Sequence, residues 1–448
     1  MGTARKYWDM EIEPLLNTPE IRDLQWSRLQ QLLHRLYEGK PFWRERMEAA
    51  GARPEELKGL DDFSRRMPIM DKAQRRQLLA DCDGDVIRAV DRSIAVPVDE
   101  VVLMAATSGT TGEPTPYPHT ERDNQVAAEL FARLLWRAGL RRGDRVVHAF
   151  GLSMWLAGVP YVQRMQHSGV CLLPVGAEGG SQRILRFAKQ FQADALFATP
   201  SLVEHLIEKA PELIGMPVGE LGIKTIVCAG EPGAGIAEVR RRIQDAYGAT
   251  LYDHGGGFGI SCDHSEYQGM HHVADDKLIF ELVDPDTREP VPFEHGARGL
   301  AVQTTLEAEG MLWMRETFGD IVQVFTEPCP CGASGFRFKV VGRADDMLKV
   351  KGVMVYPAAI DGVITGFAPR VTGEFRIVLD DPPPRVVPPL VLRVERGENV
   401  PDEQLPALAN EIEERMSSTL KVSPRIEWVA PYTFERTGGK TNFFDRRY

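Results

Sequence analysis

The sequence predicts an α/β protein with a large N-terminal domain, residues 1–341, and a small C-terminal α+β domain, residues 342–448. Its 448 residues exceed the size at which one hydrophobic core stops growing, so we expect more than one domain. From residue 145 onward, short β-rich runs alternate with amphipathic helical stretches, which indicates a mostly parallel sheet with helical crossovers. After about residue 343 this alternation gives way to a compact unit of strands and a helix.

Each part of this fold prediction rests on a local pattern. Leucines at helical spacing between residues 19 and 50 predict N-terminal helices, with Pro41 as a break. The expected strands of the sheet are RVVHAF, GVCLLPV, ADALFAT, IKTIVCA and ATLYD, and the helices between them include SQRILRFAKQF and IAEVRRRIQDAYG. In the small domain we expect strands at FRIVLD, PLVLRVER and RIEWVA and a helix over PDEQLPALANEIEERMSSTL. The proline-rich DDPPPRVVPP is expected to be a loop.

Charge and hydropathy narrow the class of partner. The chain has 53 Lys and Arg against 64 Asp and Glu, a net charge of −11 that is spread along its length. This balance argues against nucleic acid as the main partner. The first residues, MGTARKYWDMEIEP, lack the apolar core of a signal peptide, and the longest apolar runs are too short to span a bilayer. We therefore expect a cytoplasmic protein with no membrane partner.

The six cysteines are too few and too unevenly spaced for a disulfide framework in a chain of this length. Cys171 and Cys228 lie inside apolar runs and are expected in the core. Cys262, Cys329 and Cys331 lie in polar surroundings rich in glycine and proline, so a core position does not explain them.

Two segments with metal-binding side chains predict a zinc site. Cys329 and Cys331, in a Cys-Pro-Cys-Gly run, offer two thiolates to one tetrahedral ion, and Cys262 and His271 stand nine residues apart in the second segment. Four protein ligands leave no open coordination position, so the expected role of the zinc is structural. Two other histidines compete for the fourth ligand position: His264 and His272.

The strongest chemical signal is a run of hydroxylated residues and glycines. It follows the apolar run VVLMAA, where a strand gives way to a loop, and comprises Thr107, Ser108, Gly109, Thr110, Thr111 and Gly112. Glycines let the backbone approach an anion, while hydroxyl and backbone N–H groups donate to phosphate oxygens. It is not a Walker loop, because its two glycines are only three residues apart and no lysine follows. An ordinary flexible loop is the alternative.

This run resembles the phosphate-binding loop of the adenylate-forming superfamily, and further matches follow in the order of that superfamily. Ala229-Gly230-Glu231-Pro232 is similar to the segment beside the adenine. Tyr252 stands where the superfamily places an aromatic residue against the purine, and Asp320 takes the place of the aspartate that binds the ribose. The resemblance implies that ATP binds along these segments.

Two matches lie toward the C-terminus. The stretch GRADDMLKVKG resembles the superfamily's hinge motif, in which Arg343 would contact the nucleotide and Asp345 would be the pivot. Thr437-Gly438-Gly439-Lys440 matches the loop that carries the catalytic lysine. The most similar branch is that of the phenylacetate–CoA ligases, judged by GRADDMLKVKGVMVYP, the short chain and the Cys-Pro-Cys-Gly run. The resemblance implies an ATP-dependent acid–CoA ligase that forms an acyl-adenylate and releases pyrophosphate and AMP.

The sequence departs from the superfamily pattern at two places. A glutamate that helps hold Mg²⁺ usually follows the tyrosine, whereas this chain has Asp253, His254 and three glycines. Asp253 is a substitute from a neighbouring position, or the ion is held mainly by phosphates and water. Glu113 stands where Lys or Arg is usual, so one electrostatic partner of the pyrophosphate is missing.

The resemblance also suggests where the acid binds. Phe150 and Trp155 lie in the part of the sheet from which the superfamily builds its acid pocket, with an ordinary core position as an equal alternative. His254 and Gly255 are expected beside the substrate carboxylate or the adenylate. A buried, hydrogen-bonded position is expected for His148, and His119 has no recognisable partner.

Residues that follow the hinge are candidates for CoA. They are Lys349, Lys351 and Gly352, and their alternative is an ordinary solvent-facing position. The expected cofactors are ATP, CoA, Mg²⁺ and a structural Zn²⁺, and a homodimer is usual for the branch. The acid is expected to be small and aromatic, with phenylacetate, indoleacetate, benzoate-like and fused-ring acids all admissible.

Two other functions stay open. An adenylating enzyme with another acceptor, such as a carrier protein or a cofactor, would share every motif. A catalytically inactive homologue that binds a nucleotide or an acyl group is suggested by the missing glutamate. The presence of Asp320, Arg343 and Lys440 argues against the inactive homologue.

Overall fold

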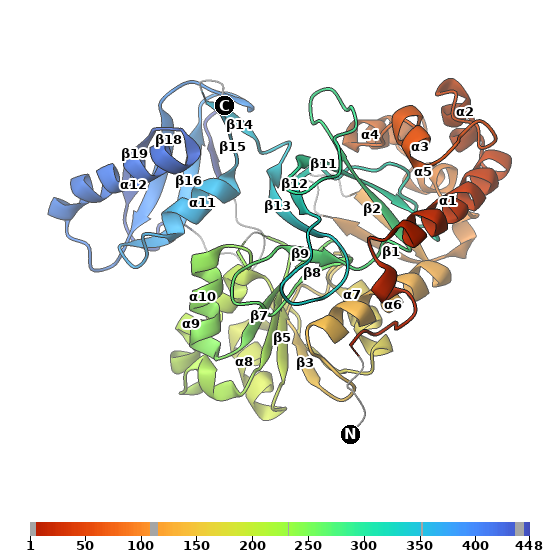
Figure 1. The fold of residues 1–448 in the computed structure, drawn as a ribbon. Helices are drawn as coiled ribbons and strands as arrows, with labels where there is room; N and C mark the ends of the chain where they lie inside the picture. The colour runs from red at the N-terminus through yellow and green to blue at the C-terminus, as the bar shows by residue number, and fades with distance from the viewer. Residues whose placement is uncertain (1–5, 108–114, 232, 351–352, 435–442) are drawn as a thin grey trace.

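The computed structural model describes residues 6–107, 115–231, 233–350, 353–434 and 443–448 (Figure 1). Several predicted site residues therefore lie outside the described residues: Ser108, Gly109, Thr110, Thr111, Gly112, Pro232, Lys351, Gly352 and Lys440. The side chain of Thr107 also lies outside them.

The predicted N-terminal helices are confirmed as α1 (Pro19–Gly39) and α2 (Pro41–Ala49), separated at the proline. The leucines of α1 are buried against Trp43 and Met47 and against Met314 in the connection between β11 and β12, which fixes this layer to the main body. Three shorter helices follow: α3 (Leu60–Arg66), α4 (Lys72–Ala80) and α5 (Val86–Ser93).

The predicted parallel sheet is confirmed. Its strands are β3 (Arg145–His148), β4 (Cys171–Pro174), β5 (Ala195–Ala198), β6 (Thr225–Cys228) and β7 (Thr250–Gly255), in the spatial order β7-β6-β5-β3-β4. One face packs against α8 (Gly180–Gln190), α9 (Pro200–Ile214) and α10 (Ala237–Tyr247). The other packs against α6 (Glu121–Arg137) and α7 (Val159–His167). Burial on both faces explains why these strands read as continuous apolar runs.

Antiparallel strands extend this sheet beyond β7. They are β8 (Gly259–Ser261), β9 (Met270–His272), β13 (Arg337–Arg343), β12 (Asp320–Phe325), β11 (Arg298–Thr305) and β10 (Leu278–Val283), so the described residues form one mixed sheet of eleven strands. A separate hairpin of β1 (Val101–Thr107) and β2 (Thr115–Thr120) holds the two ends of the glycine-rich run.

The C-terminal part has its own core (blue in Figure 1). The strands β16 (Val371–Leu379), β18 (Leu390–Arg396), β19 (Pro424–Val429) and β20 (Phe444–Arg446) form one sheet, covered by α11 (Pro357–Thr365) and α12 (Leu405–Leu420). A smaller sheet joins β14 (Leu348–Val350), β15 (Val353–Val355) and β17 (Arg385–Val386). The proline-rich segment is thus not only a loop, because β17 pairs with β14.

Short 3₁₀ helices occur at Glu13–Leu15, Val98–Glu100, Ala177–Gly179, Val218–Leu221 and Asp402–Gln404. Cys228 is buried as expected, but the core position expected for Cys171 is wrong. Cys171 is exposed because β4 is the edge strand of the sheet, where an apolar run is covered on fewer sides.

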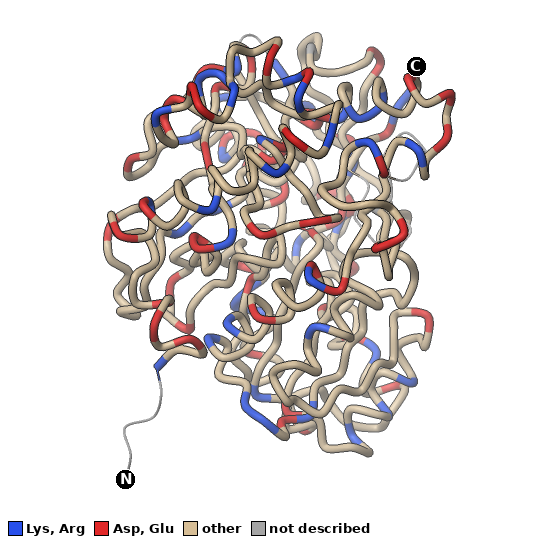
Figure 2. Tube along the Cα trace, turned by 90° about the vertical axis from the view of Figure 1, so that its right-hand side faces the viewer, with Lys and Arg blue, Asp and Glu red and all other residues tan. Residues whose placement is uncertain are grey.

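Figure 2 shows acidic and basic residues interspersed over the described chain, in agreement with an acidic surplus spread along the sequence. Within the described residues, no helix has the length and apolar character needed to cross a membrane.

Candidate active site

A cleft of about 2600 Å³ lies where the hairpin, the helices α6 and α7, the strands β6, β7 and β11–β13, and α11 meet. The structure brings seven of the predicted site residues to its walls: Trp155, Glu231, Asp253, His254, Gly255, Asp320 and Arg343. These residues come from segments far apart in the sequence, so their convergence is evidence for one site.

The end of β1 that precedes the glycine-rich run lies beside Trp155. The strands pair up to Thr107 and Thr115, so the run connects them at the tip of the hairpin. The Ala106 N–H donates to the Met154 carbonyl at 2.7 Å. Trp155 therefore lies next to the end of β1 from which the run departs.

Gly230, in the run after β6, packs directly on Trp155. Its φ of +93° is a conformation that favours glycine, and a Cβ at this position would lie 3.2 Å from the indole ring. The next residue, Glu231, accepts a hydrogen bond from the Ser201 N–H at 2.8 Å, near the N-terminus of α9. Trp155 thus lies next to the end of β1 and also contacts the predicted adenine segment at Gly230.

The predicted ribose and hinge residues form a charged cluster. Strand pairing sets Asp320 opposite Arg343, and the Arg343 guanidinium donates to Asp320 at 3.0 Å and to Asp345 at 2.9 Å. Lys72, at the start of α4, donates to Asp345 at 2.8 Å. These charged hydrogen bonds hold the pKa of the Asp345 carboxyl below its usual value, although burial works in the opposite direction.

His254 is buried, and both of its ring nitrogens are engaged. Nδ1 lies 2.8 Å from the Gly259 carbonyl, which only accepts, so Nδ1 carries the proton. Nε2 then accepts from the Tyr161 hydroxyl at 3.1 Å. Burial lowers the pKa of His254 to about 4, so the ring is neutral at pH 7. In this arrangement His254 has no spare N–H for a substrate carboxylate.

Asp253 lines the cleft on the opposite side of β7 from His254, as strand alternation requires. The Tyr267 hydroxyl donates to its carboxylate at 2.5 Å. Burial raises the pKa of Asp253, while Tyr267 and Arg240 lower it. Asp253 and Glu231 each accept one protein hydrogen bond, so part of the acceptor capacity of each carboxylate is already used.

Two predicted site residues lie behind the cleft walls. Tyr252 and Phe150 are 6% and 1% exposed and belong to the core between the sheet and α6. The helices α6 and α7 cover the face of β7 that carries Tyr252, so its contact with a purine stays a prediction. Phe150 packs edge-on behind Trp155, with ring centroids 5.6 Å apart, so it supports the lining residue instead of lining the pocket.

Lys349 lies at the surface, 3.8 Å from the Asp286 carboxylate, and not on the cleft walls. His148 is buried, and its Nε2 lies 2.8 Å from the Ala157 carbonyl, as expected of a hydrogen-bonded histidine.

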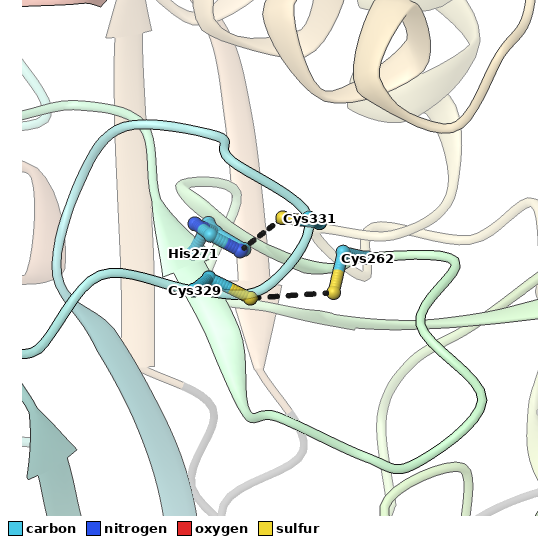
Figure 3. Close-up of side chains that lie close together, drawn as sticks. All are labelled: Cys262, His271, Cys329 and Cys331. Carbon is cyan, nitrogen blue, oxygen red and sulfur yellow. Dashed lines mark hydrogen bonds between the residues drawn. The ribbon is translucent and has the colours of Figure 1, made fainter.

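The predicted metal ligands converge away from the cleft (Figure 3). One ligand atom from each of Cys262, His271, Cys329 and Cys331 lies within 4.8 Å of every other. The Cys262 and Cys329 sulfurs are 3.8 Å apart, and Cys331 Sγ lies 3.3 Å from His271 Nε2. A tetrahedral zinc site has edges of about 3.8 Å between sulfurs and about 3.5 Å between sulfur and nitrogen.

The surroundings of this cluster fit a zinc ligand set. His271 Nδ1 lies 3.2 Å from the Ser334 carbonyl, an outer hydrogen bond that would leave Nε2 free for a metal. The alternatives to His271 lie elsewhere: His264 is half-buried outside the cluster, and His272 is buried, stacks on Phe336 and approaches Asp275 at 2.6 Å. Alternation along β9 separates His271 from His272.

Comparison with known proteins decides the family. A family model described as the AMP-binding enzyme C-terminal domain matches residues 352–447. The chain is 30% identical to phenylacetate-coenzyme A ligase of Thermus thermophilus, over 96% of this chain and 98% of that one. The chain belongs to the phenylacetate–coenzyme A ligase family. It is an ATP-dependent, AMP-forming acid–CoA ligase that acts through an acyl-adenylate.

Solved structures of another CoA ligase in two reaction states allow the overall arrangement of this ligase to be compared with each state. A 2-hydroxyisobutyryl-CoA ligase in the postadenylation state, in complex with 2-HIB-AMP, matches with a TM-score of 0.89 and 29% identity, over 100% of this chain and 93% of that one. The same enzyme in the thioesterification state, with 2-HIB-AMP and CoA, matches with a TM-score of 0.70 and 30% identity, over 100% and 94%. The ligase described here is thus more similar in overall arrangement to the postadenylation state.

The sequence analysis did not select Tyr161 or Arg164, which both line the cleft from α7. Both are buried, together with Pro160 and Met165, on one stripe of that helix. The sequence did contain a signal for Arg164, because an arginine within the apolar stripe of an amphipathic helix buries a charge. Such a position indicates a candidate site residue.

Proposed function

We propose that the ligase activates a small aromatic carboxylic acid. The observation that supports this proposal most directly is the position of Trp155, which lines the cleft next to the end of β1 and contacts Gly230 of the predicted adenine segment. Aromatic pairs gain stability from offset or edge-on packing as well as from burial, so an indole at this position favours an aryl group. The relatives' activity on phenylacetate supports the same substrate class.

The proposed nucleotide site is built from the segments named by the resemblance. The run from Thr107 to Gly112 and Lys440 would stabilise charge on the phosphoryl oxygens, while Glu231 and Pro232 would border the adenine. Asp320 would accept hydrogen bonds from the ribose, with Arg343 beside it; their 3.0 Å contact and cleft position support this pairing.

The proposed domains meet at the hinge. β13 keeps Gly342 and Arg343 in the large sheet, two residues past the expected boundary at 341, and the C-terminal core begins at Leu348. The pivot would be Asp345, between these limits. The lower similarity to the thioesterification state over the same coverage supports a rotation of the small domain between half-reactions.

The proposed CoA residues are Lys349, Lys351 and Gly352. The exposure of Lys349 outside the cleft supports a role only after rotation of the small domain. Its present neighbour, Asp286, would then be replaced by a CoA phosphate.

The proposed ions differ in their ligands. Zn²⁺ would be held by Cys262, His271, Cys329 and Cys331, a proposal that the 3.8 Å and 3.3 Å separations support. Mg²⁺ would be held mainly by phosphate oxygens and water, because Asp253 already accepts from Tyr267. We also propose a cytoplasmic location, where thiol ligands stay reduced, and a homodimer by resemblance to the branch.

ATP–pyrophosphate exchange with phenylacetates, benzoates, indoleacetate and short aliphatic hydroxy acids tests the substrate class, followed by product analysis with CoA as sole acceptor. We expect exchange with aryl acids and equal amounts of AMP and acyl-CoA. Exchange with aliphatic acids alone would contradict the aromatic proposal. Adenylation without thioester would indicate another acceptor, and no exchange with any acid would indicate an inactive homologue.

A further inference from the structure

Arg164 is a buried cation without an anionic partner. It lies in the second turn of α7, its residue is 8% exposed, and it lines the cleft. Among the described residues it forms no ion pair, and its Nε has no hydrogen-bond partner there. Arginine stays protonated in proteins, so it cannot escape the cost of burial by losing its charge. That cost amounts to several kcal/mol for an uncompensated ion, which makes an unpaired arginine in a cleft a candidate anion site.

The nearest carboxylate is already engaged. The negative charge of Asp123 raises the pKa of Arg164, but the two side chains form no ion pair among the described residues. Its oxygens accept backbone N–H groups from Thr120, Gly310 and Met311 at 2.8–3.2 Å, and from Glu309 at 3.0 Å. Asp123 therefore completes the capping box of α6, whose N-cap is Thr120, and also binds the segment after β11, so its charge is stabilised by those amides.

A second unpartnered donor lies close to Arg164. His119, in β2, is 0% exposed and lines the same cleft, and neither ring nitrogen has a hydrogen-bond partner. Burial, and then the charge of Arg164, lowers the pKa of His119 to about 3, so the ring is neutral and offers one N–H. Tyr161 adds no donor, because its hydroxyl proton is used by His254.

Arg164 and His119 mark one end of the cleft, the polar end. It lies away from the end beside Trp155, where adenylation is expected. The hairpin pairs His119 with Leu103, but Pro116 with Ala106, whose N–H contacts the Trp155 segment. Strands rise about 3.4 Å per residue, so His119 stands on the order of 10 Å along β2 from Pro116. The cleft also has an apolar section, to which α6 contributes Val126, Ala127 and Leu130.

We propose that the acid carries a second carboxylate, remote from the one that is adenylated, and that Arg164 and His119 bind it. The substrate class is then an aromatic dicarboxylic acid, in which the ring spans the apolar section. A guanidinium binds a carboxylate by two parallel hydrogen bonds, and the His119 N–H supplies a third. This inference rests on the proposed function, because it assumes that the cleft holds an aryl acid.

The test compares phenylacetate and benzoate with the same acids bearing a 3- or 4-carboxylate. We expect wild-type kcat/KM to be at least about tenfold higher for one of the diacids. Arg164→Met, which keeps the apolar stem, is expected to lower kcat/KM for that diacid by roughly 10–100-fold, as for loss of a charged hydrogen bond, and for the monoacid by less than about threefold. Arg164→Lys should recover part of the diacid activity. Arg241→Met, which removes an exposed cleft arginine on α10, is the control.

Higher wild-type kcat/KM for the monoacids would overturn the inference while leaving the proposed function intact. Equal losses for monoacid and diacid in a folded Arg164→Met variant would also overturn it. If Arg164→Met does not fold, the wild-type ranking and the diacid selectivity of His119→Phe decide. If no aryl acid of either kind supports exchange, the proposed function itself fails.

Discussion

The Trp155 ring limits the size of the residue that can stand at position 230. The ring lies against a glycine whose positive φ disfavours any side chain, so the two positions are coupled. Phe150 packs behind Trp155 and is buried, which makes it a support and not a contact for the acid. Neighbouring aromatic residues therefore have different expected effects on substitution.

Trp155→Ala should reorder the acids without weakening ATP binding. Removing the indole enlarges the proposed acid pocket, so we expect kcat/KM ratios between aryl acids to change by about tenfold. The apparent affinity for ATP should stay within about twofold. Phe150→Leu is the matched control and should lower stability by about 1 kcal/mol with no reordering. A loss of stability in Trp155→Ala without a change in the order of the acids would indicate that Trp155 is a core residue and does not contact the acid.

Asp361 should make stability depend on pH. Burial, followed by nearby Glu204 and Glu374, raises its pKa from 3.8 to about 8. The folded chain then holds a proton at this group that the unfolded chain releases, so the free energy of unfolding falls as the pH rises from about 4 to about 8. Asp361→Asn should remove this contribution to the fall in the free energy of unfolding with pH. Melting temperatures between pH 5.5 and 9 measure it, with Asp381→Asn, an exposed position, as the control. Parallel curves for wild type and Asp361→Asn would contradict this assignment.

At the scale of elements, β9 and the Cys-Pro-Cys loop lie together at the proposed metal site. β9 contributes His271, the turn after β8 contributes Cys262, and the loop between β12 and β13 contributes the other two thiols. A metal at this point would tie together three connections of the sheet. Its energetic contribution would appear as folding free energy.

Cys329→Ser should reduce zinc content and stability more than catalysis. We expect about one Zn²⁺ per wild-type chain, less than about 0.3 in the variant, and a fall in Tm of roughly 5 °C or more. Activity per folded molecule should stay within about threefold. Elemental analysis and calorimetry measure these quantities, and Cys171→Ser, on the exposed edge strand, is the matched control. Wild type without metal would refute the zinc site, and selective loss of catalysis would indicate a catalytic metal.

At the scale of the whole molecule, the hinge cluster connects the two parts of the chain. Asp345 is bonded to Lys72 of α4 and to Arg343 of β13, so this arrangement is held by charged contacts from the N-terminal part. These contacts are partly exposed and individually weak, which suits a joint that must open. The greater similarity to a postadenylation state agrees with this view.

Lys440→Ala and Asp345→Pro should impair opposite half-reactions. Lys440 would stabilise phosphoryl transfer only, so Lys440→Ala should slow adenylation by about 10²–10³-fold and leave thioester formation from prepared acyl-adenylate within about threefold. Asp345→Pro restricts the pivot and should spare adenylation while slowing thioester formation. Single-turnover assays of each half-reaction measure this, with Lys349→Ala as a control for adenylation. Equal loss of both half-reactions in Lys440→Ala would show that the C-terminal loop is misassigned.

Local patterns in the sequence determined the strand and helix order, the two-part organisation and the family, because hydrophobic period and motif order are properties of short segments. The four metal-binding side chains were also recognisable, since their residue types and polar surroundings do not suit a core. Tertiary structure alone decided which side of a strand meets the cleft. It buried Tyr252 and Phe150, exposed Cys171 at a sheet edge, and brought Arg164 and His119 to the same cleft. The reason is that exposure and charge pairing depend on which elements cover a face, and covering elements come from distant parts of the chain.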